Sequence, residues 1–214
     1  LGTGSGSDSS DPTFNGVAGR QSASEYWTFD GTADYFTLNQ ANPSWVENLH
    51  KNSAIWGFAC WLYVGASLPA AACVLFGDNA SASSQTGVSA FIRSDGTLRV
   101  TVTDSSGTAA LTITSAATVN LNSWNYLAGE VQEGAGTGSL TVNTTQLDVT
   151  STYSSPSAGA ATYTWTIGND GSPDVGTAYI PSGYRLPNIQ IWESTAPTKA
   201  QLLSLRSITS TKFA

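Results

Sequence analysis

The chain has 214 residues, of which 40% are hydrophobic and only 11% charged, and its formal net charge is −7. A chain of this length suits one large β-sandwich. The eight basic residues are scattered rather than clustered, so binding along a phosphate backbone is disfavoured and nucleic acid is not an expected partner. No apolar run reaches the roughly 18 residues of a membrane span, so no membrane partner is expected.

Residues 1–11 are mostly Gly, Ser and Asp, which is flexible-linker composition. We expect an N-terminal arm here, one domain over residues 12–208, and a C-terminal tail over 209–214. The arm has two interpretations, a solvated tail or a segment that becomes ordered against a partner. The chain shows no signal peptide and has no Met, which predicts a processed or trimmed product of something longer.

Alternation of apolar and polar residues begins at Glu25 and predicts two short strands around the turn at Asp30-Gly31. Residues 43–51 predict one or two helical turns beginning at Pro43. A buried strand is predicted at 55–64, and a short closing helix at 198–206. Further strands are predicted at 73–76, 87–93, 98–103, 109–114, 124–131, 139–143, 147–149, 161–167 and 184–192.

The segment 98–114 alternates most regularly, because Leu98, Val100 and Val102 are separated by Arg99 and Thr101. This pattern predicts an antiparallel meander with one buried and one wet face. About twelve strands, frequent turn signals and no alternation of strands with helices predict an all-β fold. We expect a two-sheet antiparallel jelly-roll sandwich with one or two short helices.

Several segments resemble the laminin G-like branch of the concanavalin A-like lectin/glucanase superfamily. Tyr-Trp-Thr-Phe-Asp-Gly at 26–31 resembles its entry strand pair, and Phe-Ala-Cys-Trp-Leu-Tyr at 58–63 resembles its central tryptophan strand. Asn-Ser-Trp-Asn-Tyr-Leu-Ala at 122–128 and Ile-Gln-Ile-Trp at 189–192 resemble later strands. The resemblance covers most of residues 24–208 and implies the jelly-roll fold.

A narrower resemblance is to jelly-roll domains of tailed-phage virion proteins, carried by residues 11–19, 24–31, 43–51 and 182–186. It implies a non-enzymatic structural protein at the virion surface, either a capsid decoration (cement) protein or a head-fibre protein. Its partners would be major capsid or tail subunits and further copies of itself. The alternative is a carbohydrate-binding, lectin-like module or a receptor-binding tail module, with a glycan as partner.

The two cysteines, Cys60 and Cys73, both lie in apolar runs. If residues 65–70 form a hairpin loop, the two could face each other and form a disulfide. The favoured interpretation is two small buried thiols.

Catalysis is not expected. Glycosidases need two cooperating carboxyl groups, and Glu130 and Glu133 are the nearest pair here. Residues three apart on a strand face opposite sides, so both are interpreted as solvated surface acids. His50, the single histidine, is interpreted as a surface or cap residue, because no nucleophile motif accompanies it. No His/Cys cluster suggests zinc.

Calcium is the one cofactor considered, because relatives of the resembled family often bind it through loop oxygens. Asp78 and the loop containing Asn169, Asp170 and Asp174 are the predicted ligands, although Asp and Asn are also ordinary turn residues. No other cofactor is expected.

A sugar site would need an exposed aromatic ring. Tyr179 and Trp165 are the predicted ligand residues, from a set that also contains Trp27, Trp45 and Tyr163. Burial in the core is the default interpretation for a tryptophan inside an alternating strand.

Overall fold

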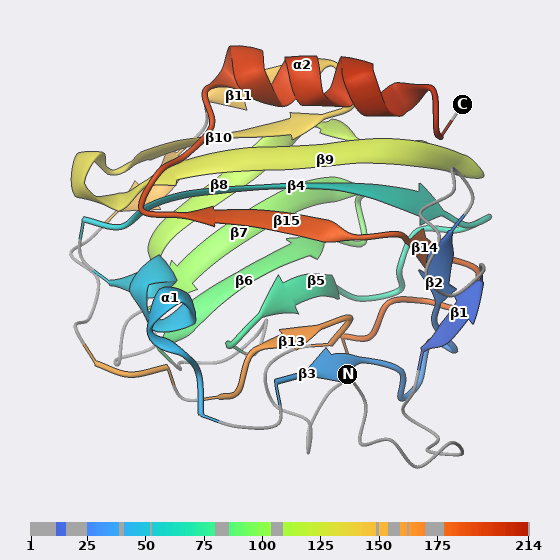
Figure 1. Ribbon diagram of the computed structural model, residues 1–214, viewed down its shortest axis with the longest axis horizontal. Coiled ribbons are helices and arrows are strands. Elements are labelled where there is room, and N and C mark those ends of the chain that lie inside the picture. The colour runs from blue at the N-terminus through green and yellow to red at the C-terminus, as the bar shows by residue number, and fades with distance from the viewer. Residues whose placement is uncertain are drawn as a thin grey trace.

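The computed structural model describes residues 12–15, 25–38, 41–51, 53–79, 86–103, 109–148, 150–153, 159–161, 163–169 and 178–213. These residues form two antiparallel sheets packed face to face, and one long helix lies across the outside of one sheet (Figure 1). The predicted all-β sandwich with short helices is confirmed. The predicted arm over residues 1–11 lies outside the described residues.

The first sheet has eight strands, with β15 pairing on β4 beside the path of the other seven. In spatial order they are β1 (Thr13–Asn15), β2 (Tyr26–Thr28), β14 (Arg185–Leu186), β4 (Ile55–Val64), β9 (Ser123–Gln132), β10 (Thr137–Val142) and β11 (Thr145–Asp148), with β15 (Ile189–Glu193).

The second sheet has seven strands. In order they are β12 (Thr150–Tyr153), β8 (Ala109–Thr118), β7 (Thr97–Thr103), β6 (Gly87–Ile92), β5 (Cys73–Gly77), β13 (Thr166–Ile167) and β3 (Phe36–Thr37). The helical segments are α1 (Ser44–Glu47), η1 (Asn48–His50), η2 (Glu133–Ala135) and α2 (Lys199–Ser210).

The main core fills the space between the sheets. On β7, Leu98, Val100 and Val102 are fully buried, whereas Arg99 and Thr101 are half-buried on the other face. The predicted meander is therefore confirmed, with the period of two that a strand imposes on its side chains.

Strand β4 is buried on both faces because α2 covers the outer one. Phe58 and Leu62 point into the main core, while Trp61 packs in a second cluster with Tyr126 and Leu202 of α2. Complete burial of a side chain such as Leu202 contributes roughly 1.5–3 kcal/mol to stability. This explains the continuous apolar run of 55–64 in an antiparallel sheet.

Helix α2 starts at a capping box in which Thr198 and Gln201 satisfy each other's backbone amides. It ends at Ser210, four residues later than predicted, because Trp61 of β4 donates its indole N–H to Thr209 Oγ1 at 2.8 Å. Phe213, in the predicted tail, stacks on Trp61 at 5.1 Å. In the described part of the chain, no helix has the length and apolarity needed to cross a membrane.

The two cysteines do not lie across a hairpin, so that alternative was wrong. Cys60 belongs to β4 and Cys73 to β5, and these strands are in different sheets because residues 65–72 cross between the layers. Both thiols are free and buried, as the favoured interpretation predicted. Burial raises the pKa of Cys60 to about 12 and that of Cys73 further, so neither is a reactive thiolate at neutral pH.

Candidate ligand-binding site

The pairing along one side of β4 is interrupted between β14 and β15. Arg185 pairs with Tyr63, and Ile189 pairs with Cys60. Three residues, 186–188, therefore oppose the two residues 61 and 62 of β4, which is the geometry of a β-bulge. Pro187 lies in this bulge and has no N–H to continue the ladder. The extra residue turns Asn188 outward, and its side chain is exposed.

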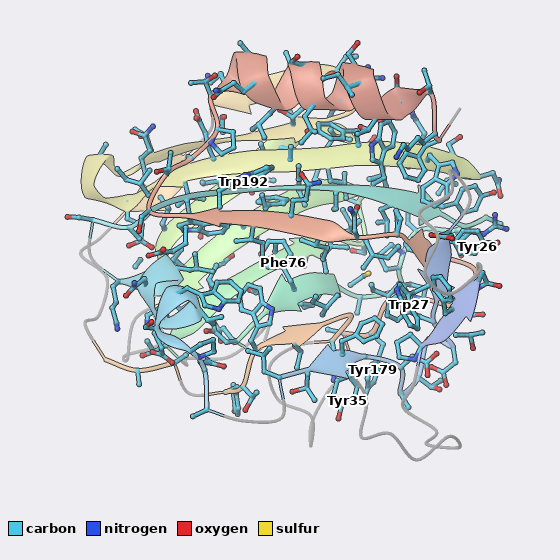
Figure 2. All side chains as sticks on the ribbon, in the orientation of Figure 1. Tyr26, Trp27, Tyr35, Phe76, Tyr179 and Trp192 are labelled. Atoms are coloured by element: carbon cyan, nitrogen blue, oxygen red, sulfur yellow. The ribbon has the colours of Figure 1, made fainter. Side chains whose placement is uncertain are left out.

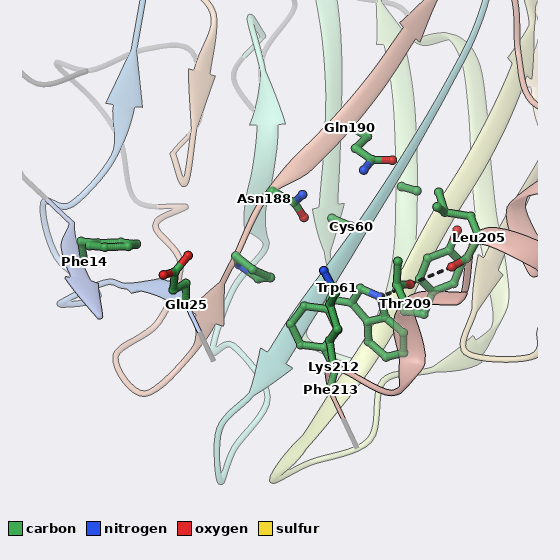
Figure 3. Close-up of a pocket in the computed structure, with 13 residues that line it drawn as sticks. Phe14, Glu25, Cys60, Trp61, Asn188, Gln190, Leu205, Thr209, Lys212 and Phe213 are labelled. Carbon is green, nitrogen blue, oxygen red and sulfur yellow. Dashed lines mark hydrogen bonds between the residues drawn. The ribbon is translucent and has the colours of Figure 1, made fainter. Parts of the chain in front are cut away.

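Beside the bulge, the outer face of the first sheet and the end of α2 enclose a hollow of about 250 Å³, here called the amide cavity (Figure 3). Its lining includes the side-chain amides of Asn188 and Gln190, the ammonium group of Lys212 and the carboxylate of Glu25. The hydroxyl-bearing residues Tyr126 and Thr209 line it as well. Glu25 Oε1 is buried and has no hydrogen-bond partner among the described residues. A buried acceptor of this kind favours a ligand that donates hydrogen bonds.

The other wall of the amide cavity is aromatic and held firmly. Trp61 and Phe213 stack at 29°, and Thr209 Oγ1 both accepts from the Trp61 indole and donates to Leu205 O at 2.8 Å. Tyr126 donates to Leu202 O, also at 2.8 Å. These bonds fix the rings before any ligand arrives, so binding costs little side-chain entropy.

A second hollow of about 410 Å³, here called the aromatic groove, lies between the edges of the two sheets. Trp45 of α1 is 39% exposed and meets Trp165 edge to face at 6.0 Å. Trp165 is only 4% exposed and stacks on Phe76 at 5.4 Å, which is the buried position that was the default interpretation for a tryptophan, and its contact with a sugar stays a prediction. The start of β13 places Trp165 over the core, and Trp45 presents the more exposed ring.

Tyr179, the other predicted sugar residue, is half-buried between the buried Ala178 and Ile180. Figure 2 shows it in the lower part of the view, below Trp27 and Phe76. It lines neither the amide cavity nor the aromatic groove. Its contact with a sugar stays a prediction.

Of the predicted calcium ligands, Asp78 and Asn169 are described, whereas Asp170 and Asp174 lie outside the described residues. Asp78 is fully buried after β5, where its carboxylate accepts from Val88 N at 2.8 Å and Asn42 Nδ2 at 3.2 Å.

Burial, reinforced by the charge of Glu47, raises the pKa of Asp78 to about 8. Asn169 is buried after β13, and its carbonyl accepts from Thr166 Oγ1 at 2.8 Å. Within the described ranges, no three His, Cys, Asp or Glu residues gather in a way that could hold a metal ion. A calcium site stays a prediction.

The segment at 159–165 is held by side chains from the α1 region. Asn42 donates to Tyr163 O at 2.9 Å and accepts from Trp165 N at 2.7 Å. Glu47 accepts from Ala161 N at 3.1 Å. Alternate residues of the segment are thus bonded by side chains in place of a neighbouring strand, which fixes Trp165 beneath the aromatic groove.

His50 completes this arrangement, because its Nε2 lies 2.9 Å from Gly159 O. It is fully buried, so its interpretation as a surface residue was wrong. The ring is enclosed because η1 packs against the segment that contains Gly159, a contact between residues 109 positions apart in the sequence.

The two acids considered for catalysis lie in different environments. Glu130 is half-buried on β9 and accepts from Ser139 Oγ at 3.3 Å. Glu133 is fully buried, with no hydrogen-bond partner for its carboxylate in the described structure, so its interpretation as a solvated acid was wrong. Burial raises the pKa of Glu133 to about 8. Strand β10 and the turn at residues 53–54 lie against Glu133, and local alternation of apolar and polar residues could not reveal this burial.

Two antiparallel sheets, a helix packed outside one of them and a small amphipathic cavity define a lectin-like β-sandwich. Residues 30–194 match a laminin G-like family model described as the concanavalin A-like lectin/glucanases superfamily. The chain belongs to this family. No curated protein is significantly similar to it.

Solved structures share the fold at low identity. The sialidase carbohydrate-binding module CBM40 of Ruminococcus gnavus, bound to α2,3-sialyllactose, is 12% identical with a TM-score of 0.56, and the match covers 84% of this chain and 95% of that one. Botulinum neurotoxin type C, whose cell entry depends on two ganglioside molecules, is 12% identical with a TM-score of 0.59 over 96% and 46%. NanB sialidase of Streptococcus pneumoniae is 13% identical with a TM-score of 0.59 over 83% and 26%, so this chain spans about a quarter of it.

Proposed function

We propose that this domain is a non-catalytic carbohydrate-binding module that holds a sugar in the amide cavity. The observation that carries the proposal is the convergence of Asn188, Gln190, Lys212 and Glu25 beside a fixed aromatic wall. Support comes from the shared fold, because a sialidase binding module and a ganglioside-dependent toxin have it.

The lining matches the two chemical faces of a sugar. Asn188 and Gln190 each offer an acceptor oxygen and two N–H donors, which suits neighbouring hydroxyl groups. The half-buried ring of Phe213 suits the C–H face of the pyranose, and the buried ring of Trp61 stacks against it and holds it in place. With about 1 kcal/mol for each net hydrogen bond, four such bonds and the ring contact favour a Kd on the order of 0.1–1 mM.

The lining also supports binding without hydrolysis. Glycosidases place two carboxyl groups roughly 5–9 Å apart around the scissile bond. Glu25 is the single carboxylate among the described residues that line the amide cavity. A bound sugar would therefore lack the second acid or base that cleavage requires.

A glycan array followed by isothermal titration calorimetry tests the proposal. The double variant Asn188→Ala/Gln190→Ala should weaken binding of the best array glycan at least tenfold, because both amides would be lost from the cavity. Asn120→Ala/Gln132→Ala is the matched control, since both side chains are exposed and neither lines the cavity. Equal affinity in the two double variants would contradict sugar binding at this place.

The virion role stays a prediction from the sequence, as do the virion location, the capsid or tail partners and the homo-oligomer. The similar structures are a sialidase, the binding module of a second sialidase and a toxin, and none of them is a virion protein. A glycan-binding domain fits the receptor-binding tail module better than capsid decoration. Mass spectrometry of purified particles would test the location directly.

A further inference from the structure

The amide cavity and the aromatic groove share a boundary. Pro187 and Asn188, two of the three residues of the bulge, line both hollows. The bulge is therefore a low ridge between them, and a ligand that contacts Asn188 in one hollow is already at the rim of the other.

A continuous aromatic surface also joins the two hollows. Phe14 of β1 lines the amide cavity, and its ring lies 4.9 Å from that of Trp27, which lines the aromatic groove. Trp27 in turn meets Phe36 of β3 edge to face at 5.0 Å. Figure 2 shows Trp27 beside β2, at the side of the sandwich where β1 and β14 also lie.

The two hollows differ sharply in chemistry. The amide cavity is lined by the charged groups of Glu25 and Lys212 and by two side-chain amides. In the aromatic groove, the polar side chains of the described lining are those of Thr37 and Asn188. The remaining groove residues are hydrocarbon or aromatic, and Trp27, Phe36, Trp45 and Trp165 supply the rings. An open apolar hollow of this kind favours the binding of an apolar group, which displaces water from it.

We infer that the two hollows together bind one amphipathic glycoside, with its sugar in the amide cavity and its apolar aglycone in the aromatic groove. The inference rests on the proposed sugar binding. We assign the aglycone to the groove because the groove adjoins Asn188, the residue that would also contact the sugar. Since the glycosidic bond joins the two parts, the aglycone enters the groove at a high effective concentration.

Matched pairs of glycosides test this by isothermal titration calorimetry. The probes are the methyl and n-octyl β-glycosides of glucose, galactose and N-acetylglucosamine, each below its critical micelle concentration. Octyl tetraethylene glycol is the sugar-free control. Burial of about four methylenes corresponds to a gain on the order of 100-fold, so at least one octyl glycoside should bind about that much more tightly than its methyl partner.

Variants locate the gain. Trp45→Ala should reduce the octyl gain at least tenfold and leave the affinity for the methyl glycoside unchanged, because Trp45 lines the groove but not the amide cavity. Leu121→Ala is the control, since Leu121 is 42% exposed and lines neither hollow. As an independent measurement, an octyl glycoside carrying a diazirine at its chain end should photolabel the peptides that contain Leu38 or Trp45.

The outcomes separate this inference from the proposed function. Equal affinities for methyl and octyl glycosides, or label outside the groove, would overturn the amphipathic ligand and leave sugar binding intact. Binding of octyl tetraethylene glycol as tight as that of the octyl glycosides would overturn sugar recognition, and with it the joint occupancy. Failure of every glycoside to bind would overturn both.

Discussion

Replacement of Glu133 by glutamine should remove the contribution of one titrating group to the pH dependence of the free energy of unfolding. Glu133 is fully buried at the end of β9, and its carboxylate has no hydrogen-bond partner in the described part of the chain. Burial raises its pKa from 4.5 to about 8. The folded state therefore binds more protons than the unfolded state between these pH values, and stability falls as pH rises through this range.

The size of the effect follows from the shift. A shift of about 3.5 pKa units corresponds to about 5 kcal/mol of stability lost between pH 4.5 and 8, with a slope approaching 1.4 kcal/mol per pH unit. Glutamine cannot ionise, so Glu133→Gln should remove that slope. The buried amide brings its own unpaired N–H, which costs about 1–3 kcal/mol at acidic pH. The change in slope, rather than the absolute stability, is the diagnostic quantity.

Urea denaturation at half-unit steps from pH 5 to 8 measures the slope directly. Glu193→Gln is the matched control, because hydrogen bonds from Ser194 and Asn48 hold the pKa of Glu193 below its usual value and outside this window. Parallel stability curves for wild type and Glu133→Gln across the pH series would refute the reasoning. They would mean that water reaches the carboxylate in the folded state.

Two further predictions concern buried positions elsewhere. Asp78→Asn should also reduce the loss of stability with rising pH, because burial raises the pKa of Asp78 to about 8. The double variant with Glu133→Gln should show almost no dependence of stability on pH in the urea series. Gly138→Ala should destabilise the fold by about 2–3 kcal/mol in chemical denaturation, since its Cβ would lie 2.1 Å from Ile113 Cδ1. Gly65→Ala, whose Cβ meets nothing closer than 3.5 Å, should cost under about 1 kcal/mol and serves as its control.

The layered β fold follows from local patterns in the sequence. The alternation of Leu98, Val100 and Val102 predicts β7 with its correct buried face, because side-chain direction along a strand has a fixed period of two. Pro43 and the apolar residues after it predict the short helix of α1 and η1 for a similarly local reason.

The candidate site could not be predicted in the same way. Asn188, Gln190 and Lys212 form no motif, and they converge because a bulge opposite β4 and the end of α2 meet on one face of the sheet. The proline of the bulge was the one local signal, and it indicates an interrupted ladder without indicating what lies beside it.

Local alternation predicted most of the strands and the buried face of β7, because both depend on neighbours along the chain. It missed β1 and β12, and it predicted a strand at 161–167 where, among the described residues, only Thr166–Ile167 is one. The tertiary structure decided which groups are buried together. Glu133 and His50 were interpreted as surface residues, yet both are buried by segments far away in the sequence. Burial depends on long-range packing, and local periodicity does not encode it.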